Sequence, residues 1–204
     1  MKIFLASTSP RRRQLMSEAG FAFELVNPET DEIERKGEPP RAMVKRFTLD
    51  KAENASKLLP AASTGIVIAA DTTVVSPDGK RVLNKPVSEA DARRMLGVIS
   101  GRTHVVLTGY AVFAIKSGKI AKRHYAVVRT SVKMRKLSSA AIAAYVASGE
   151  PMDKAGAYGA QGIGMGLIES IKGSYSNVVG LPMAELLRDL EKKFKLKPDW
   201  RNRA

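Results

Sequence analysis

The first twenty residues of this 204-residue chain restrict its fold more than any other stretch. Ile3 to Ala6 form a short apolar run that predicts a buried strand, and a hydroxyl-rich turn follows it. Ser9 and Pro10 suit the N-cap and first position of a helix, and Gly20 suits its end. The chain therefore begins with a strand, a serine-rich turn and a helix.

Three arginines, Arg11 to Arg13, stand in the first turn of that predicted helix. The helix dipole favours negative charge at this end, so the arginines conflict with it locally. Free backbone N–H groups, serine hydroxyls and guanidinium groups together would bind a phosphate. A phosphate site and a solvated basic turn are both open on this stretch alone.

Composition excludes several kinds of site. The chain has no cysteine and only two histidines, His104 and His124, which excludes disulfides and thiolate sites and argues against a multi-histidine zinc site. It shows no signal peptide and no apolar run long enough to span a membrane, so we expect a cytoplasmic protein without membrane contact. We expect residues 1–204 to form a single domain of two closely packed lobes, with a basic tail at about 195–204.

The formal net charge is +14, and much of it lies in two segments. Residues 116–136 carry eight lysines and arginines and no acid, and the chain from Arg188 onward is also basic. Along residues 126–135, apolar or small side chains alternate with Arg129, Lys133 and Arg135, as in a half-exposed antiparallel strand. We interpret this charge as serving solubility or electrostatic steering rather than nucleic-acid binding.

Three charged positions stand out in otherwise unremarkable elements. Residues 27–32 form a polar loop with three carboxylates, which are either simply exposed or suited to a hard cation. Lys51 falls on the apolar stripe of a helix predicted from Pro39 to about Leu59, where its stem either snorkels or aims the ammonium at a buried anion. Asp71 ends a buried strand predicted from Gly65, the usual place for chemistry in α/β proteins.

The remaining pattern alternates strands and helices. A strand is predicted at 22–26, a hairpin turn at 77–79, a helix capped by Ser88, two long strands at 105–115 and 120–134, and helices at 138–147 and 182–194. The glycine-studded stretch 151–162 suits a close approach of the backbone to some other group. No dinucleotide or Walker A glycine motif occurs.

In this order, the landmarks resemble one family, the Maf-like nucleoside triphosphate pyrophosphatases. The matching segments are Ala6-Ser7-Thr8-Ser9-Pro10-Arg11-Arg12, Asp31-Glu32, Asp50-Lys51-Ala52, Ala70-Asp71-Thr72, Lys85-Pro86, Ser100-Gly101, Asp153-Lys154-Ala155-Gly156-Ala157-Tyr158-Gly159, Gln161-Gly162 and Val179-Gly180-Leu181-Pro182. The resemblance implies an α/β fold with a mixed twisted sheet, flanking helices and two lobes around a central cleft, similar to the inosine triphosphate pyrophosphatases.

The resemblance also implies an activity: metal-assisted hydrolysis of a nucleoside triphosphate to the monophosphate and pyrophosphate. Carried over by position, Asp71 would accept the proton from water, and Glu32 and Asp71 would hold a divalent cation, Mg²⁺ or else Mn²⁺ or Co²⁺. The triphosphate would be held by Ser7, Arg12, Lys51 and Lys85. Relatives are commonly homodimers, but the sequence leaves the oligomeric state open.

Three positions match the branch of the family that acts on dTTP and UTP, namely Arg11, Thr72 and Gln161. Gln161 offers both a donor and an acceptor, which suits the carbonyl and N3–H edge of such a pyrimidine. Two alternatives stay open. One is the same reaction on 7-methyl-GTP or CTP, and the other is a basic protein without enzymatic activity that binds nucleic acid or regulates division.

Overall fold

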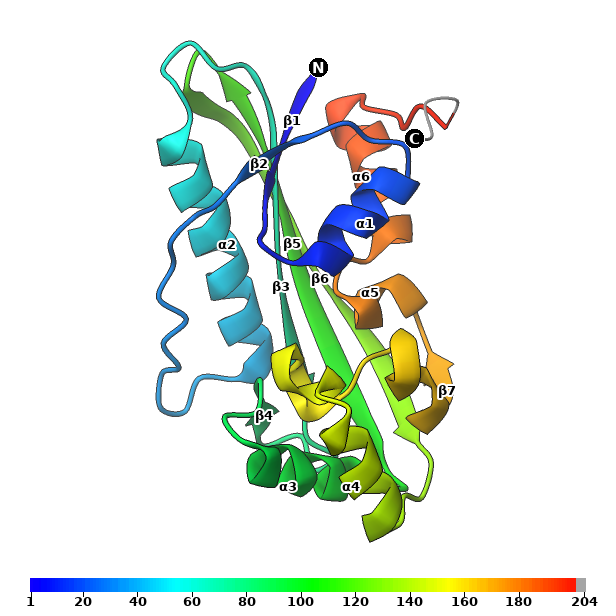
Figure 1. Cartoon of the computed structure of the whole chain (residues 1–204). Coiled ribbons are helices and arrows are strands. Elements are labelled where there is room, and N and C mark those ends of the chain that lie inside the picture. Colours follow the sequence, from blue (N-terminus) through cyan, green and yellow to red (C-terminus); the bar gives the residue numbers. More distant parts are fainter. Residues whose placement is uncertain (201–204) are drawn as a thin grey trace. The chain divides into compact units, whose positions relative to one another are not determined.

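The computed structural model describes residues 1–200 (Figure 1). The strands are β1 (Lys2–Ala6), β2 (Glu24–Val26), β3 (Gly65–Val75), β4 (Val82–Leu83), β5 (Thr103–Lys116), β6 (Lys119–Met134) and β7 (Ile168–Lys172). The helices are α1 (Pro10–Glu18), α2 (Pro40–Leu58), α3 (Glu89–Ile99), α4 (Ser139–Ala147), α5 (Tyr175–Val179) and α6 (Met183–Phe194). Short 3₁₀ turns η1 (Glu150–Asp153), η2 (Ala155–Ala157) and η3 (Gly162–Leu167) follow α4.

The strands form one mixed sheet, in the order β2-β1-β3-β5-β6-β7, with β4 paired to β3. β1 lies between β2 and β3 and is parallel to both, whereas β4 and β7 pair antiparallel with β3 and β6. A mixed sheet with flanking helices confirms the predicted α/β class.

The chain divides into two compact units. Unit 1 comprises residues 1–71, 108–128 and the chain from Gly180 on, and unit 2 comprises residues 72–107 and 129–179. The long strands β3, β5 and β6 contribute residues to both units, which are described separately below.

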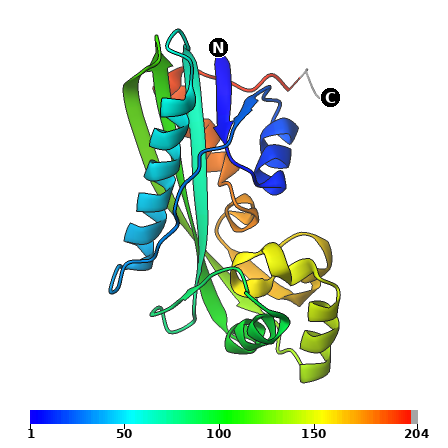
Figure 2. The ribbon, with the colours of Figure 1, turned by 60° about the vertical axis from the view of Figure 1, so that its left-hand side comes forward.

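In unit 1, alternate residues of the strands pack against helices on the two faces of the sheet. Ile3 and Leu5 of β1 pack with Met16 of α1 and Leu186 of α6, while Phe4 faces the other way. The face that Phe4 shares is covered by Ala52 and Ala55 of α2. Figures 1 and 2 show the same arrangement, with α2 on one side of β1 and β3 and with α1 and α6 on the other. Ile3 to Ala6 are all buried, because a strand that is covered on both faces needs apolar side chains at successive positions.

In unit 2, the core lies between the strands and the helices α3 and α4. Leu96 and Ile99 of α3 and Tyr145 of α4 pack with Val106 of β5 and Val132 of β6. The predicted cap of α3 is confirmed, since Ser88 Oγ accepts a hydrogen bond of 3.1 Å from Asp91 N–H.

Several predicted elements are confirmed and others need correction. Helix α1 begins at Pro10 with Ser9 as N-cap, and Gly20 follows its end with φ of +83°. The predicted strand 22–26 is only Glu24–Val26. The 3.6-residue spacing of the predicted helix also places Leu58 on its apolar stripe, but Leu58 is exposed at the end of α2. The sequence patterns missed β7 and α5, because each is only five residues long and too short for a clear period.

Among residues 1–200, no helix is both long and apolar enough to cross a membrane. The predicted basic tail begins at Lys195, directly after α6, and its last part, residues 201–204, lies outside the described residues.

Candidate functional site

Asp71 lies in β3 just beyond the end of the neighbouring strand. The last pair in the parallel register of β1 with β3 joins Ala6 to Ala69, so Asp71 is two residues past the point where β1 leaves the sheet. The expectation that the strand ends at Asp71 is wrong, because β3 continues to Val75. Asp71 is nevertheless at the carboxyl end of β1, where open α/β sheets bind their ligands. Its residue exposure is only 6%.

A single ammonium group joins Asp71 to the acidic loop. Lys51 Nζ lies 2.6 Å from Asp71 Oδ1 and 2.5 Å from Glu32 Oε1, although the three residues come from α2, β3 and the loop before α2. The Lys51 side chain is 13% exposed, so its ammonium is aimed inward at the carboxylates. The two carboxylate oxygens are therefore no farther apart than the sum of these two distances.

Arg12 brings a second cation to the same group of charges. Its Nε donates a hydrogen bond of 2.8 Å to the carbonyl of Gly180, which fixes the side chain against the chain before α6. Burial lowers the pKa of Arg12, and attraction by Asp71 and Glu32 opposes this while Arg11 adds to it. Arginine stays charged even so, and two cations and two anions of unit 1 therefore interact here.

Ser7 follows β1 directly and is buried. Its Oγ accepts a hydrogen bond of 3.2 Å from Ser9 N–H, which shapes the turn before α1. The Ser9 side chain does not accept a hydrogen bond from the first turn of α1. The backbone N–H groups of that turn therefore receive no hydrogen bond from the N-cap side chain. Such a turn is suited to an anion.

Three predicted site residues belong to unit 2. Thr72 is half-buried in β3, and Lys85 is exposed in the segment after β4. Gln161 is half-buried just before η3, and within residues 1–200 its side-chain amide makes no hydrogen bond to the protein. The structure thus leaves the roles of these three residues as predictions.

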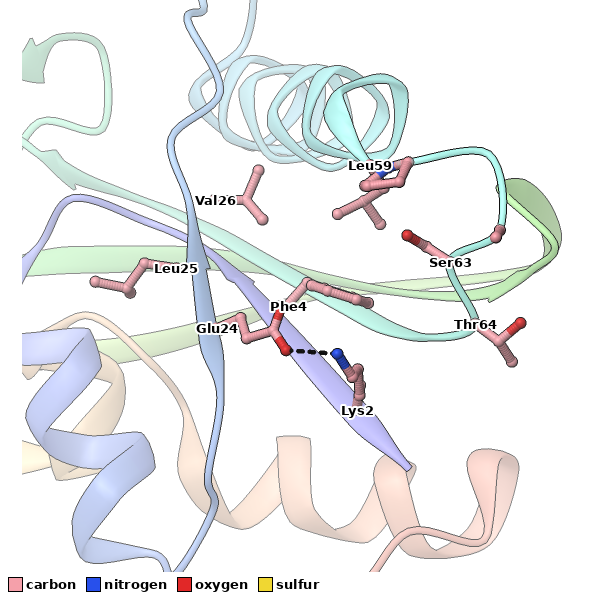
Figure 3. Close-up of a pocket in the computed structure, with 10 residues that line it drawn as sticks. Lys2, Phe4, Glu24, Leu25, Val26, Leu59, Ser63 and Thr64 are labelled. Atoms are coloured by element: carbon pink, nitrogen blue, oxygen red, sulfur yellow. Dashed lines mark hydrogen bonds and ion pairs between the residues drawn. The ribbon is translucent and has the colours of Figure 1, made fainter.

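A cavity in unit 1 is separate from this group of charges. It has a volume of about 410 Å³ and is lined mainly by Phe4, Leu25 and the segment after α2 (Figure 3). Two of its lining residues, Lys2 and Glu24, form an ion pair of 2.9 Å. Lys2 and Phe4 belong to the amino-terminal part of β1, so the cavity lies toward the end of that strand opposite to Ser7. None of the predicted site residues lines it.

Two polar features of unit 2 were not singled out from the sequence. His104 is buried, and its Nε2 lies 2.7 Å from Tyr158 Oη. The Glu150 carboxylate contacts the loop that carries Gln161. The glycine-rich stretch 151–162 was a signal for the second feature, but the residue that the backbone approaches is not evident from the sequence.

A family model and the sequences of related proteins both match nearly the whole chain. The family model for Maf-like protein matches residues 2–193. A dTTP/UTP pyrophosphatase of Shewanella oneidensis is 47% identical over 190 residues, which cover 91% of this chain and 94% of the relative. A dTTP/UTP pyrophosphatase of Gloeobacter violaceus is 44% identical over 194 residues, which cover 95% of this chain and 96% of the relative.

Among solved structures, the Staphylococcus aureus Ham1 protein aligns with 82% of this chain and 80% of its own. Its sequence identity is 15% and its TM-score is 0.44, a likeness too low to carry an argument about this fold. The family model covers nearly the whole chain and the sequence relatives are far above chance similarity. This chain therefore belongs to the Maf-like protein family.

Proposed function

We propose that this chain is a nucleoside triphosphate pyrophosphatase that converts dTTP and UTP to the nucleoside monophosphate and pyrophosphate. The names of relatives that are 42–47% identical to this chain support the reaction and the substrates. The observation that carries the proposal is the meeting of Glu32 and Asp71 at the Lys51 ammonium. Acids and cations that meet at the end of a parallel strand are suited to a polyphosphate.

The donor set fits a divalent metal. Although the described residues contain no group of three or more metal-binding side chains, Mg²⁺ commonly uses only one or two carboxylates together with substrate phosphates. Glu32 and Asp71 already share one cationic atom, so their oxygens converge on a position where positive charge is favoured. We propose that these two residues hold Mg²⁺, with Mn²⁺ and Co²⁺ as alternatives. When bound, such an ion supplies positive charge that offsets the charge developing on the pyrophosphate.

The chemical step needs a base near the α-phosphorus. In the proposal, Asp71 accepts a proton from the attacking water, whose oxygen forms the new bond to the α-phosphorus. The bond from that phosphorus to the bridging oxygen breaks, and pyrophosphate leaves with the electron pair. General-base catalysis of this kind contributes roughly 10²- to 10⁴-fold in rate.

The remaining predicted residues hold and select the substrate. Lys51, Arg12 and Lys85 would neutralise phosphate oxygens, and Ser7 would donate a hydrogen bond to one of them. Gln161 would pair with the base edge, and Arg11 and Thr72 would contribute to the same selectivity. We further propose that the enzyme works in the cytoplasm on free nucleotides.

A hydrolysis screen tests this function. Purified protein with Mg²⁺ is incubated with canonical triphosphates and with 7-methyl-GTP, and pyrophosphate and monophosphate are both quantified. The proposal expects equimolar pyrophosphate and monophosphate, with dTTP and UTP hydrolysed fastest. A preference for CTP or 7-methyl-GTP would refute the substrates, and salt-sensitive DNA binding without any hydrolysis would refute the enzyme.

A further inference from the structure

The loop that carries Gln161 is tied down by side chains on both sides of that residue. Before it, Gly159 N–H donates to Tyr145 Oη at 3.1 Å, and Tyr175 Oη donates to the carbonyl of Ala160 at 3.1 Å. After it, the N–H groups of Ile163 and Gly164 donate to the Glu150 carboxylate, each at 2.8 Å. All of these residues belong to unit 2.

The ties to Glu150 and Tyr145 form one connected network. Tyr145 Oη accepts from Gly159 N–H and donates to Glu150 Oε1 at 2.9 Å. The Glu150 carboxylate therefore accepts three hydrogen bonds, one from a hydroxyl and two from backbone N–H groups. Burial alone raises the pKa of Glu150, but the bonds from Gly164, Ile163 and Tyr145 outweigh it and the pKa is lowered. The ionised carboxylate is the form that the loop stabilises.

The glycines of this loop are explained by the same network. A Cβ on Gly162, which has φ of +69°, would lie 2.6 Å from Glu150 Oε2. A Cβ on Gly164 would lie 2.6 Å from Tyr145 Oη. Real Cβ atoms do not approach oxygen so closely, so the backbone wraps around these two side chains only because side chains are absent here. At Gly162, the close approach that the glycine-rich stretch 151–162 predicts is therefore made to Glu150, whereas Gly156 approaches Val74.

Gln161 lies at the centre of this loop and is held differently. Its neighbours are fixed through their backbone, whereas its own side-chain amide bonds to no group among residues 1–200. A residue whose backbone is fixed and whose side-chain amide makes no hydrogen bond to the described protein is suited to present a donor and an acceptor to a ligand in one orientation.

We propose that Glu150 is a positioning residue for base selection: its carboxylate, with Tyr145, holds the Gly159–Gly164 loop so that the Gln161 amide faces the pyrimidine base in a set orientation. This inference rests on the proposed function, since it assumes that Gln161 contacts the base. It adds Glu150 and Tyr145, which do not touch the substrate, as determinants of selectivity.

The test is the Glu150→Gln variant of the full chain, assayed with UTP and CTP in Mg²⁺. A glutamine of the same shape presents oxygen to only one of the two backbone N–H groups and an NH₂ group to the other. We expect the ratio of kcat/KM for UTP to that for CTP to fall on the order of tenfold, because misplacement of a polar contact reduces discrimination. Glu169→Gln removes the same charge from an exposed residue of β7 in the same unit and should leave the ratio unchanged.

A double-mutant cycle with Gln161→Ala separates positioning from a merely structural effect. If Glu150 acts through Gln161, the Glu150→Gln change lowers the ratio in the native background and has no further effect on it beside Gln161→Ala. An equal loss on UTP and CTP, or the same drop of the ratio in both backgrounds, overturns the inference.

Two further results distinguish this inference from the proposed function. If Gln161→Ala itself leaves the ratio unchanged, Gln161 does not read the base, and the proposed base contact fails together with the role of Glu150. If Gln161→Ala lowers the ratio but Glu150→Gln does not, only the positioning role fails. Should Glu150→Gln not fold, Tyr145→Phe decides the matter, since it removes only the hydroxyl between Gly159 and Glu150 and should lower the ratio in the same direction.

Discussion

Lys51 and Asp71 are 20 positions apart in the chain, on a helix and on a strand, yet Lys51 Nζ lies 2.6 Å from Asp71 Oδ1. Both side chains are largely buried, at 13% and 9% exposure. A buried ion pair costs desolvation that hydrophobic side chains of the same volume would not. The position of this ion pair at the carboxyl end of β1 therefore points to a role in binding or catalysis rather than in stabilising the fold.

The first prediction concerns Asp71 itself. Asp71→Asn keeps the shape of the side chain but removes its capacity to accept a proton, so hydrolysis of dTTP and UTP should fall on the order of 10³-fold or more. The far-ultraviolet circular dichroism spectrum should not change. Glu53→Gln, an acid-to-amide change at a partly exposed position of α2, is the matched control and should retain full activity. Near-normal hydrolysis by Asp71→Asn would remove this residue from the mechanism.

The second prediction concerns the ammonium between the two carboxylates. Lys51→Met leaves Asp71 buried without its partner, which should lower the free energy of unfolding by about 3 kcal/mol. Because the ammonium and a divalent cation compete for the same oxygens, added Mg²⁺ should raise the melting temperature of Lys51→Met more than that of the unmodified chain. Thermal unfolding with and without MgCl₂ measures both effects.

Lys57→Met provides the control for this experiment, since Lys57 lies on the same helix but is exposed. Its melting temperature should change little, with or without Mg²⁺. If Mg²⁺ shifts Lys51→Met no more than it shifts Lys57→Met, Glu32 and Asp71 do not hold the ion.

The third prediction concerns base recognition. Gln161→Glu keeps the shape of the side chain but replaces its NH₂ donor with a second acceptor oxygen. A pyrimidine carbonyl would then face a carboxylate. We expect kcat/KM for dTTP and UTP to fall roughly 100-fold, because a site with a mismatched polar group rejects its substrate strongly. Since the Gln161 amide bonds to no described protein group, the melting temperature should change by less than about 3 °C. An unaltered substrate profile would contradict the base-reading role.

The fourth prediction concerns acid stability in unit 2. Burial lowers the pKa of His104 to about 4 from its ordinary value of 6.5. Between these values the unfolded chain binds a proton that the native ring does not, so stability is complete above about pH 6.5 and is lost as the pH falls toward 4. The shift corresponds to about 3 kcal/mol at most. His104→Asn should therefore lose less free energy of unfolding over this range than the unmodified chain.

Denaturant titrations at pH 7, 5.5 and 4.5 would measure this difference, and a chemical-shift titration of the His104 ring would show it neutral at pH 5. Parallel stability curves for the two proteins would contradict the prediction.

The pattern of the chain determined much of the fold in advance because the signals are local. A run of consecutive apolar residues defines β1, and Ser88 beside an acidic first turn defines the start of α3. Glycine at the turn of the β5–β6 hairpin supplies a positive φ that the long strands need. Each of these signals depends on residues within a few positions of one another, and hydrogen bonding and propensity act over that range.

The tertiary structure alone decided which distant side chains meet. Glu32, Lys51 and Asp71 come together because β1 and β3 pair in parallel register and α2 packs against their shared face, a relation that no local pattern contains. Likewise, the glycine-rich sequence predicts a close approach of the backbone, but only the packed unit shows that Gly162 and Gly164 of η3 approach Glu150 and Tyr145. Local spacing specifies an element and its buried face, whereas the distance between two remote charges depends on how whole elements pack.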